Sequence, residues 1–390
     1  MSHPDLRPFE FLSAGRIVFG SGVSKTLGER AVALGRRALW VTGKDHSRSA
    51  ALARQLEAAG IALEHFSVVG EPRLEDAKLA VQAGQRGGAE LVIACGGGSV
   101  IDLAKAAAAL LANPRDPLEF LEVIGQGKPL SRPALPMVAI PTTAGTGAEV
   151  TKNAVLVSPE HRVKASLRHD SMLPALALLD PELTSSMPPS VTAATGLDAL
   201  TQCLEPYVSG AHNPITDALS LEGLRRGARS LPNAFRDGSD LAAREDMALC
   251  SLFGGLALAN AKLGAVHGFA APIGGRFPSP HGAVCARLLP LVMQTNVLAL
   301  RQRAPQSHVL ARFERVAKVL TDDARASVDD GIAFVQQLAR ELGVPGLASY
   351  GMTAADIPEL AAQASRASSM KGNPIELTQA ELHQILNDGL

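Results

Sequence analysis

The stretch Leu91–Ser99, with the sequence LVIACGGGS, decides the fold, because an apolar run ends in three glycines before the helical pattern Val100–Leu111. A short apolar run of this kind is typical of a buried parallel strand. Glycines let backbone N–H groups approach a phosphate group closely, and the N-terminus of the next helix adds a favourable partial charge. G-G-G-S differs from the standard G-x-G-x-x-G fingerprint, so the segment alone leaves two interpretations open: a dinucleotide-binding turn or a tight turn without a ligand.

Further apolar runs alternate with helical patterns on both sides of this stretch. The runs are Arg37–Thr42, Ala62–Val69, Met137–Ile140 and Leu176–Leu179. The segments between them, such as Ser49–Ala59 and Leu74–Arg86, carry Ala, Leu and charged residues at helical spacing. This alternation predicts a doubly wound α/β domain with a parallel sheet.

The second half of the chain has a different pattern. After Asp180–Pro181, long Ala- and Leu-rich helical stretches replace the strand-like runs. Capping boxes mark two late helix starts, at Thr353 with Asp356 and at Thr378 with Glu381. A length of 390 residues also favours two domains. We therefore expect a doubly wound α/β domain at 1–184 and an all-α domain at 185–390.

Composition excludes several classes of partner. With 37 basic and 38 acidic residues, the chain lacks the positive charge that nucleic acids or anionic membranes attract. The four cysteines lie far apart and form no C-x-x-C pair, so we expect reduced core thiols; they are Cys95, Cys203, Cys250 and Cys285. The segment Met1–Phe11 has no apolar core of a signal peptide, and a cytoplasmic protein without a membrane anchor is expected.

A second polar turn follows the run Met137–Ile140. It has the sequence PTTAGTG at Pro141–Gly147, and its hydroxyl groups and glycines suit a phosphate or ribose; the hydroxyls belong to Thr142, Thr143 and Thr146. Because the carboxyl ends of neighbouring parallel strands meet at one crevice, the two turns together favour a dinucleotide site. Lys164 could neutralise the pyrophosphate or orient the nicotinamide.

The end of the first long strand bears on the choice of cofactor. An acidic residue there would accept hydrogen bonds from the adenosine ribose and repel a 2′-phosphate. This chain has Gly43 at that place, with Lys44 and Arg48 close behind. We therefore expect the site to tolerate NADP.

A group of metal-ligand types lies in the second half. Asp198 and Gln202, four residues apart in a helical pattern, project from the same helix face. Further along, His267 and His281 flank a predicted loop rich in proline and glycine. One carboxylate, two imidazoles and one amide oxygen make a possible tetrahedral set, although each residue could also be an ordinary buried side chain.

These motifs occur in the order found in one family. The matching segments are Gly96–Asp102, Pro141–Thr151, Asp180–Pro181, Gly196–Leu200, His267 and Pro280–Gly282. By them the chain resembles the iron-containing (group III) alcohol dehydrogenases. The resemblance implies a Rossmann-like dinucleotide-binding domain at 1–184, a helical metal- and substrate-binding domain at 185–390, and a cofactor cleft between the two. It also implies the cofactor residues Gly97, Gly98, Ser99, Asp102, Thr142, Thr143, Thr146 and Lys164. The metal positions that it implies are Asp198, Gln202, His267 and His281.

Two positions depart from this family. The family usually has histidine where this chain has Gln202, and an amide oxygen is a weaker ligand for zinc or iron. The family often has a further histidine at the position of Ala271, so a proton relay through that side chain cannot operate here.

The resemblance implies an NAD(P)-dependent oxidoreductase that interconverts a small alcohol and its aldehyde or ketone. A divalent ion, Fe²⁺ or Zn²⁺, on the catalytic residues Asp198, His267 and His281 would act as a Lewis acid during hydride transfer. The alternatives are a metal-independent carbonyl reductase and a degenerate NAD(P)-binding protein without turnover. A homodimer or a higher homo-oligomer is also implied.

Overall fold

The computed structural model describes residues 8–161 and 163–390. The chain forms two compact units. Residues 13–143 and 147–186 make up the α/β unit, and residues 8–12, 144–146 and 187–390 make up the helical unit. The fold class expected from the sequence, a Rossmann-like α/β part followed by an all-α part, is confirmed.

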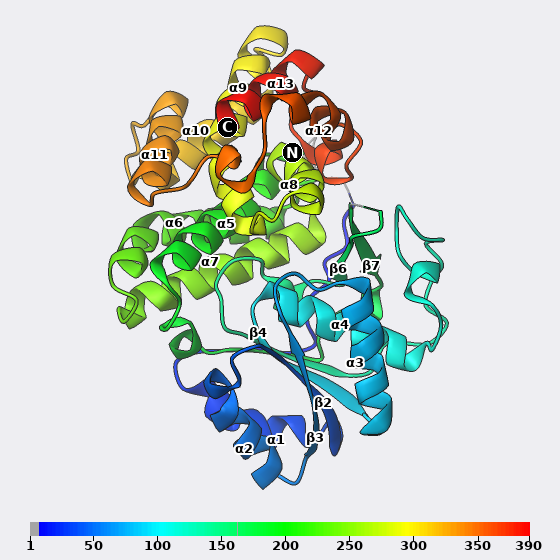
Figure 1. Cartoon of the computed structure of the whole chain (residues 1–390). Coiled ribbons are helices and arrows are strands. Elements are labelled where there is room, and N and C mark those ends of the chain that lie inside the picture. The colour runs from blue at the N-terminus through cyan, green and yellow to red at the C-terminus, as the bar shows by residue number, and fades with distance from the viewer. Residues whose placement is uncertain (1–7, 162) are drawn as a thin grey trace. The chain divides into compact units, whose positions relative to one another are not determined.

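The α/β unit is built on a parallel sheet (Figure 1). In the described part of the chain it has six strands in the order β1-β8-β5-β4-β2-β3. The strands are β1 (Ile17–Phe19), β2 (Arg37–Gly43), β3 (Ala62–Val68), β4 (Leu91–Gly96), β5 (Met137–Pro141) and β8 (Leu176–Leu179). Every strand run expected from the sequence lies in this sheet, within a residue or two of its predicted ends.

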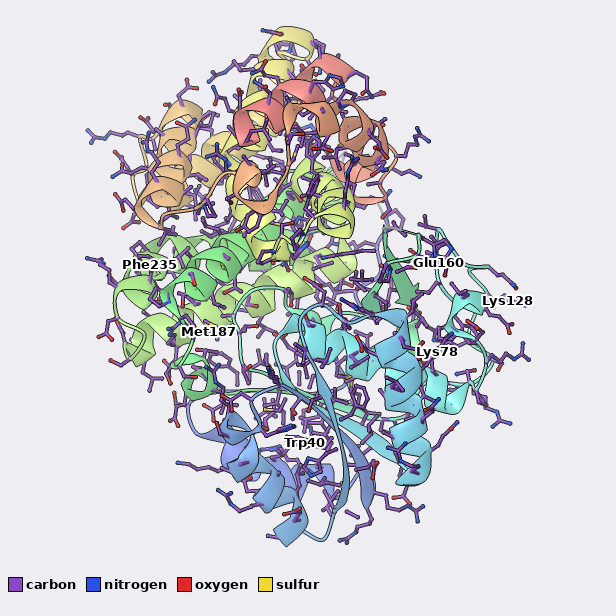
Figure 2. All side chains as sticks on the ribbon, viewed as in Figure 1. Trp40, Lys78, Lys128, Glu160, Met187 and Phe235 are labelled. Atoms are coloured by element: carbon purple, nitrogen blue, oxygen red, sulfur yellow. The ribbon has the colours of Figure 1, made fainter. Side chains whose placement is uncertain are left out.

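Helices cover both faces of the sheet, and alternate residues of each strand enter two different cores. The helices are α1 (Leu27–Ala31), α2 (Ala50–Ala58), α3 (Leu74–Arg86) and α4 (Gly98–Ala112). On β2, Leu39 and Val41 pack with α3 and α4, whereas Ala38 and Trp40 pack with α1 and α2. Trp40 is almost fully buried in that second core (Figure 2). The doubly wound pattern follows from this alternation.

Three described strands lie outside the apolar runs identified in the sequence. One is the edge strand β1, which has only three residues. The other two, β6 (Asn153–Ser158) and β7 (Val163–Arg168), form an antiparallel pair outside the main sheet. Runs this short carry a weak periodic signal, and their pairing comes from neighbours in space.

The helical unit begins with three long helices, α5 (Pro189–Val208), α6 (Pro214–Arg236) and α7 (Leu241–Asn260). It continues with α8 (Ala265–Arg276), α9 (His281–Arg303), α10 (His308–Thr321), α11 (Val328–Glu341), α12 (Ile357–Ala364) and α13 (Gln379–Gly389). Both capping boxes expected from the sequence are present, before α12 and before α13. The helix α9 is long and apolar enough to cross a membrane, and α7 with α8 would pass as a bent pair, but 72% of the apolar window of α9 is buried inside the fold.

The loop expected between His267 and His281 is mostly helical, so that expectation was wrong. Residues up to Arg276 belong to α8, although Pro272 lies inside the helix. The buried side chains of Phe269 and Ile273 anchor this helix in an apolar cluster with α9, α12 and α13. Their packing outweighs the low helix propensity of the glycines and the proline.

Candidate active site

The glycine turn lies between β4 and α4. Gly97 stands before the first residue of α4, and no described side chain caps that helix end. A Cβ atom on Gly97 would lie 3.3 Å from the side chain of Thr143 in the second polar turn. The two turns are therefore neighbours, and the backbone N–H groups of the first helical turn are placed where a phosphate could bind them.

The neighbouring turn follows β5, which pairs with β4 so that Pro141 lies opposite Gly96. Thr142 donates its backbone N–H to the carbonyl oxygen of Gly96 at 3.0 Å. Thr142 and Thr143 thus lie at the same sheet edge as the glycine turn. Thr146 belongs to the helical unit, with the short segment 144–146.

Asp102, one turn into α4, makes two contacts within the α/β unit. Its Oδ2 atom accepts the N–H of Val155 at 3.1 Å, and its Oδ1 atom lies 3.4 Å from Nζ of the buried Lys105. Lys105 also donates to Oγ1 of Thr151 at 2.7 Å. Asp102 therefore connects α4 to β6, and this structural role does not require a cofactor.

The predicted cofactor residue Lys164 lies on β7 with its side chain almost completely buried. Its ammonium group is 3.3 Å from the carboxylate of Glu71. This ion pair already balances the charge of Lys164 in the structure. A pyrophosphate would have to compete with Glu71 for it.

Glu149, which lies close to Lys105, is a buried acid beside the second turn. Burial raises its pKa to about 7, while its own backbone N–H and the charge of Lys105 act in the opposite direction. A folded-state pKa above the unfolded value means that the native state binds more protons between about pH 4.5 and pH 7, so this group costs stability as the pH rises through that window.

We expect Glu149→Gln to raise the melting temperature at pH 8 and to leave it nearly unchanged at pH 5. From the pKa of about 7, ionisation of Glu149 costs about 3 kcal/mol of folding free energy at pH 8. Thermal unfolding at both pH values measures the difference. The exposed Glu160→Gln is the matched control (Figure 2), and an equal shift at both pH values would contradict the assignment.

Gly43 ends β2, opposite Val68 of β3. A Cβ atom at Gly43 would meet no described atom within 4 Å, so a larger side chain fits there. Of the nearby cations, Arg48 lies 3.4 Å from Asp45, and both side chains are more than half exposed. An anionic group beside Gly43 would therefore have open space, with the cation Arg48 and the anion Asp45 both a few residues along the chain.

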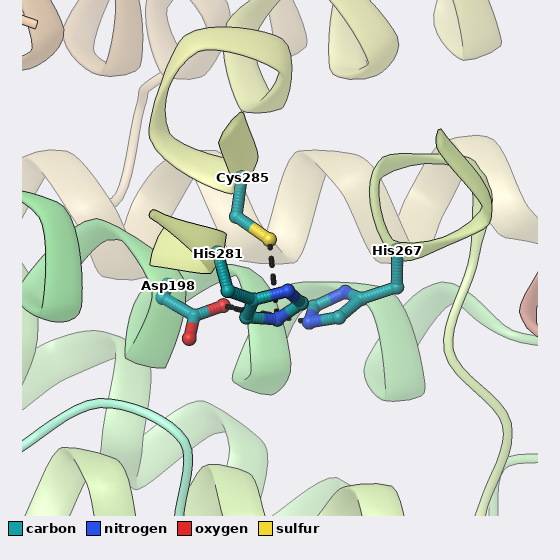
Figure 3. Close-up of side chains that lie close together, drawn as sticks. All are labelled: Asp198, His267, His281 and Cys285. Atoms are coloured by element: carbon teal, nitrogen blue, oxygen red, sulfur yellow. Dashed lines mark hydrogen bonds and ion pairs between the residues drawn. The ribbon is translucent and has the colours of Figure 1, made fainter. Parts of the chain in front are cut away.

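The second group of candidate residues gathers in the helical unit. Asp198 comes from α5, His267 from α8, and His281 is the first residue of α9. The Oδ1 atom of Asp198 lies 3.4 Å from Nε2 of His267 and 3.8 Å from Nε2 of His281. Figure 3 shows the three side chains pointing toward one another.

Asp198 and His267 are buried, and polar atoms of both side chains lack hydrogen bonds in the described part of the chain. Both carboxylate oxygens of Asp198 and the Nε2 atom of His267 have no hydrogen-bond partner among the described residues. Asp198 is 1% exposed. A buried carboxylate without hydrogen bonds is costly unless a cation compensates it, so the arrangement points to a positively charged ligand.

Close packing of α9 on α5 brings His281 to Asp198. A Cβ atom on Gly282 would lie only 2.8 Å from the carbonyl oxygen of Ala194. Any side chain at Gly282 would push the start of α9 away from α5. The glycine after His281 is therefore a packing requirement of this site.

Sequence reasoning missed Glu205, which lies two helical turns after Asp198 on α5. Its Oε2 atom accepts a hydrogen bond from Nδ1 of His267 at 2.7 Å, and its Oε1 atom accepts the N–H of Val266 at 2.7 Å. Glu205 thus holds the start of α8 and fixes the tautomer of His267. With Nδ1 bonded to Glu205, Nε2 is the ring atom that faces Asp198 and is available to a ligand.

Sequence reasoning also missed Cys285, which was expected to be a plain core thiol. It is buried, as are Cys95, Cys203 and Cys250, and all four are free thiols in the described structure. Its Sγ atom lies 3.7 Å from Nε2 of His281. One ligand atom from each of Asp198, His267, His281 and Cys285 lies within 4.8 Å of the others (Figure 3).

Gln202 is buried one turn after Asp198 on α5. Its Nε2 atom donates to the carbonyl oxygen of Gly145 at 3.2 Å. Its Oε1 atom has no hydrogen-bond partner in the part of the chain that is described. The hydrogen bond from the amide nitrogen thus holds Gln202 in place, and its amide oxygen remains available to a ligand.

The surroundings of Asp198 favour its ionised form. Burial would raise the pKa of Asp198, but His281 and His267 lower it to about 2. Burial lowers the pKa of His267, while Cys285, Asp198 and Glu205 raise it, and the net direction is upward. Burial and the nearby Asp198 raise the pKa of the Cys285 thiol to about 12. Asp198 is therefore ionised at neutral pH.

Comparison with known proteins agrees with this geometry. Residues 14–181 match the family model of iron-containing alcohol dehydrogenase, and residues 192–390 match the C-terminal model of the Fe-containing alcohol dehydrogenase family. The chain belongs to this family. The probable alcohol dehydrogenase EutG of Escherichia coli K12 is 37% identical over 94% of this chain and 90% of its own length.

Solved structures show the same fold over the whole chain. A 1,3-propanediol oxidoreductase structure has a TM-score of 0.91 at 31% identity and covers 98% of this chain and 100% of its own. The sulfoacetaldehyde reductase of Bifidobacterium kashiwanohense in complex with NAD⁺ has a TM-score of 0.86 at 28% identity, over 98% of this chain and 99% of its own. As a member of the iron-containing alcohol dehydrogenases, the protein is a nicotinamide-dependent oxidoreductase of small alcohols, in a family that uses NAD(H) and a divalent metal.

Proposed function

We propose that this alcohol dehydrogenase binds its cofactor with the predicted domain 1–184 and its metal and substrate with the predicted domain 185–390. The observation that supports this best is the convergence of Asp198, His267 and His281, in which both carboxylate oxygens of the buried Asp198 and the Nε2 atom of the buried His267 have no hydrogen-bond partner among the described residues. A degenerate protein without turnover would have no need of such a costly arrangement.

The residues present fit a divalent metal ion. A tetrahedral ion with bonds of about 2.0–2.1 Å to nitrogen and oxygen separates two such ligands by about 3.3 Å. The distances of 3.4 Å and 3.8 Å from Asp198 to the two histidines are close to that value. Asp198, His267 and His281 would hold the ion, and the fourth ligand is Gln202 or Cys285. When bound, the ion supplies Lewis-acid chemistry to the alcohol or carbonyl oxygen.

The chain's own groups have distinct parts in this reaction. Asp198 contributes negative charge at the site. Glu205 orients His267 through Nδ1, so that the Nε2 lone pair faces the reacting centre. The glycine turn and the second turn align the dinucleotide, with Gly97, Gly98, Ser99, Thr142 and Thr143 at the sheet edge and Thr146, Asp102 and Lys164 as further candidates. Ala271 offers no proton-transfer group, so protons leave through solvent or a ribose hydroxyl.

The cofactor is NADP in preference to NAD under this proposal. No carboxylate stands at Gly43 to accept hydrogen bonds from the ribose, and the space beside it is open. Lys44 and Arg48 follow within five residues. A 2′-phosphate would find room and positive charge where an acidic residue would otherwise repel it.

Metal analysis combined with turnover tests the proposed function. Freshly purified protein is analysed for bound metals and assayed for oxidation of short alcohols and reduction of their aldehydes with both cofactors. We expect turnover with NADP(H) that is lost after chelation and restored by a divalent ion. Full turnover after verified metal removal would favour the metal-independent carbonyl reductase instead.

Glu205→Gln should lower metal affinity and kcat/KM by about 10- to 100-fold, the range for partners that orient a metal-binding histidine. The neutral amide loses the charge-assisted bond to Nδ1 of His267 and can present its N–H₂ group instead. Competition with a chromophoric chelator measures the affinity, and circular dichroism checks the fold. An unchanged affinity in a folded variant would show that Glu205 serves only to hold the start of α8.

We also propose a cytoplasmic homodimer. The four buried free thiols suit a reducing compartment, and the edge strand β1 pairs only with β8 among the described strands. Light scattering on the purified protein measures its mass in solution. A monomer at micromolar concentration would contradict the dimer.

A further inference from the structure

Cys285 is the one member of the buried group for which the sequence offered no role. It lies on α9, four residues after His281, and helical spacing places both side chains on one face. It is fully buried, and its Sγ atom makes a weak contact with Nε2 of His281. A thiol that only filled the core would not need to lie within 4.8 Å of ligand atoms of two histidines and a carboxylate.

The sulfur position suits a metal ligand. A tetrahedral ion with a bond of about 2.3 Å to sulfur separates that sulfur from a nitrogen ligand by about 3.6 Å. The distance from Sγ of Cys285 to Nε2 of His281 is 3.7 Å. All four ligand atoms of the group lie within 4.8 Å of one another, so they converge on one small volume.

Gln202 is the competing fourth ligand. Its Nε2 atom is bonded to the carbonyl oxygen of Gly145, which ties the amide to the segment 144–146. An amide oxygen is a hard neutral donor, whereas a thiolate is a soft anionic donor that binds zinc and cobalt strongly. Position 202, where the family usually has histidine, thus holds a poorer ligand for such ions than the thiol of Cys285.

We infer that Cys285, rather than Gln202, completes the metal site, and that the Asp-His-His-Cys set prefers a thiophilic divalent ion such as Zn²⁺ to Fe²⁺. This inference rests on the proposed metal-assisted function and names its ion. On binding, a bond forms between sulfur and the ion, and the thiol proton passes to a solvent base. Neither the protein nor the ion changes oxidation state.

Cobalt substitution tests the ligand directly. The metal-free full-length protein is titrated with Co²⁺ under nitrogen, and the absorption spectrum is recorded. We expect an intense thiolate-to-cobalt charge-transfer band in the near ultraviolet for the wild type and for Gln202→Ala. Cys285→Ser should lack the band. Cys250→Ala, which removes a buried thiol of the same unit outside the group, should keep it.

Competition between ions tests the preference. Cys285→Ser should weaken Zn²⁺ binding by more than the roughly 100-fold seen for outer partners of a ligand, and weaken Fe²⁺ binding less. If Cys285→Ser does not fold, X-ray absorption at the zinc edge of the wild type identifies the ligands instead. A sulfur ligand gives a scattering shell at a Zn–S distance of about 2.3 Å. A wild type without a sulfur ligand, or a Gln202→Ala variant that loses more affinity than Cys285→Ser, would overturn the inference.

The two proposals can fail separately. A sulfur-ligated ion in a protein whose turnover survives metal removal would leave the inference intact and end the proposed Lewis-acid role. Metal-dependent turnover without a sulfur ligand would support the proposed Lewis-acid role and overturn the inference about Cys285.

Discussion

Asp198→Asn should lower kcat/KM by about 1000-fold in both directions of the reaction, because it removes the buried charge that attracts the metal ion. Several kcal/mol of transition-state stabilisation depend on such an ion, and each 1.36 kcal/mol is a factor of ten in rate. Asparagine has nearly the same shape as aspartate, so the packing of α5 is preserved. Steady-state kinetics with a metal analysis of the same sample measures the effect.

The control for Asp198→Asn is Asp329→Asn, which makes the same chemical change at an exposed residue of the helical unit. We expect the kcat/KM of this control variant to stay within twofold of the wild-type value. Loss of the exposed ion pair should cost about 1 kcal/mol or less of folding free energy, so the variant should stay folded. A folded Asp198→Asn variant that retains more than a tenth of the activity would contradict the role of Asp198.

Gly43→Asp should reverse the cofactor preference, with the ratio of kcat/KM for NADPH over NADH falling by about 100- to 1000-fold. A carboxylate about 4–5 Å from the 2′-phosphate repels it by several kcal/mol at the effective dielectric constant of a protein surface. The same carboxylate accepts hydrogen bonds from the ribose of NADH. The open space at Gly43 accommodates the new side chain without displacing its neighbours.

Gly43→Asn separates charge from size in this prediction. The amide has the shape of aspartate without its charge, so most of the preference for NADPH should remain. Binding of both reduced cofactors by fluorescence titration gives a second measurement that does not depend on the substrate. A wild type that already prefers NADH, or equal effects of Asn and Asp, would exclude the charge argument.

Local patterns were sufficient for the main features of the fold. The strand β4 and the glycines after it were recognised because an apolar run followed by a flexible turn is a property of consecutive residues. The pairing of β6 with β7 was not, since both strands are short and lie outside the main sheet. The helix α8 was mistaken for a loop because its glycines and Pro272 disfavour a helix that only packing stabilises.

The sequence by itself determined the alternating α/β half, the helical half, the glycine turn and the placement of Asp198 and Gln202 on one helix face. These depend on spacings within one element, which the chain fixes locally. Only the tertiary structure decided which groups surround Asp198. Glu205 meets His267 across 62 residues, and Cys285 joins the group because Gly282 lets α9 lie against α5. Contacts between elements depend on how helices pack, and no pattern along a single segment records that.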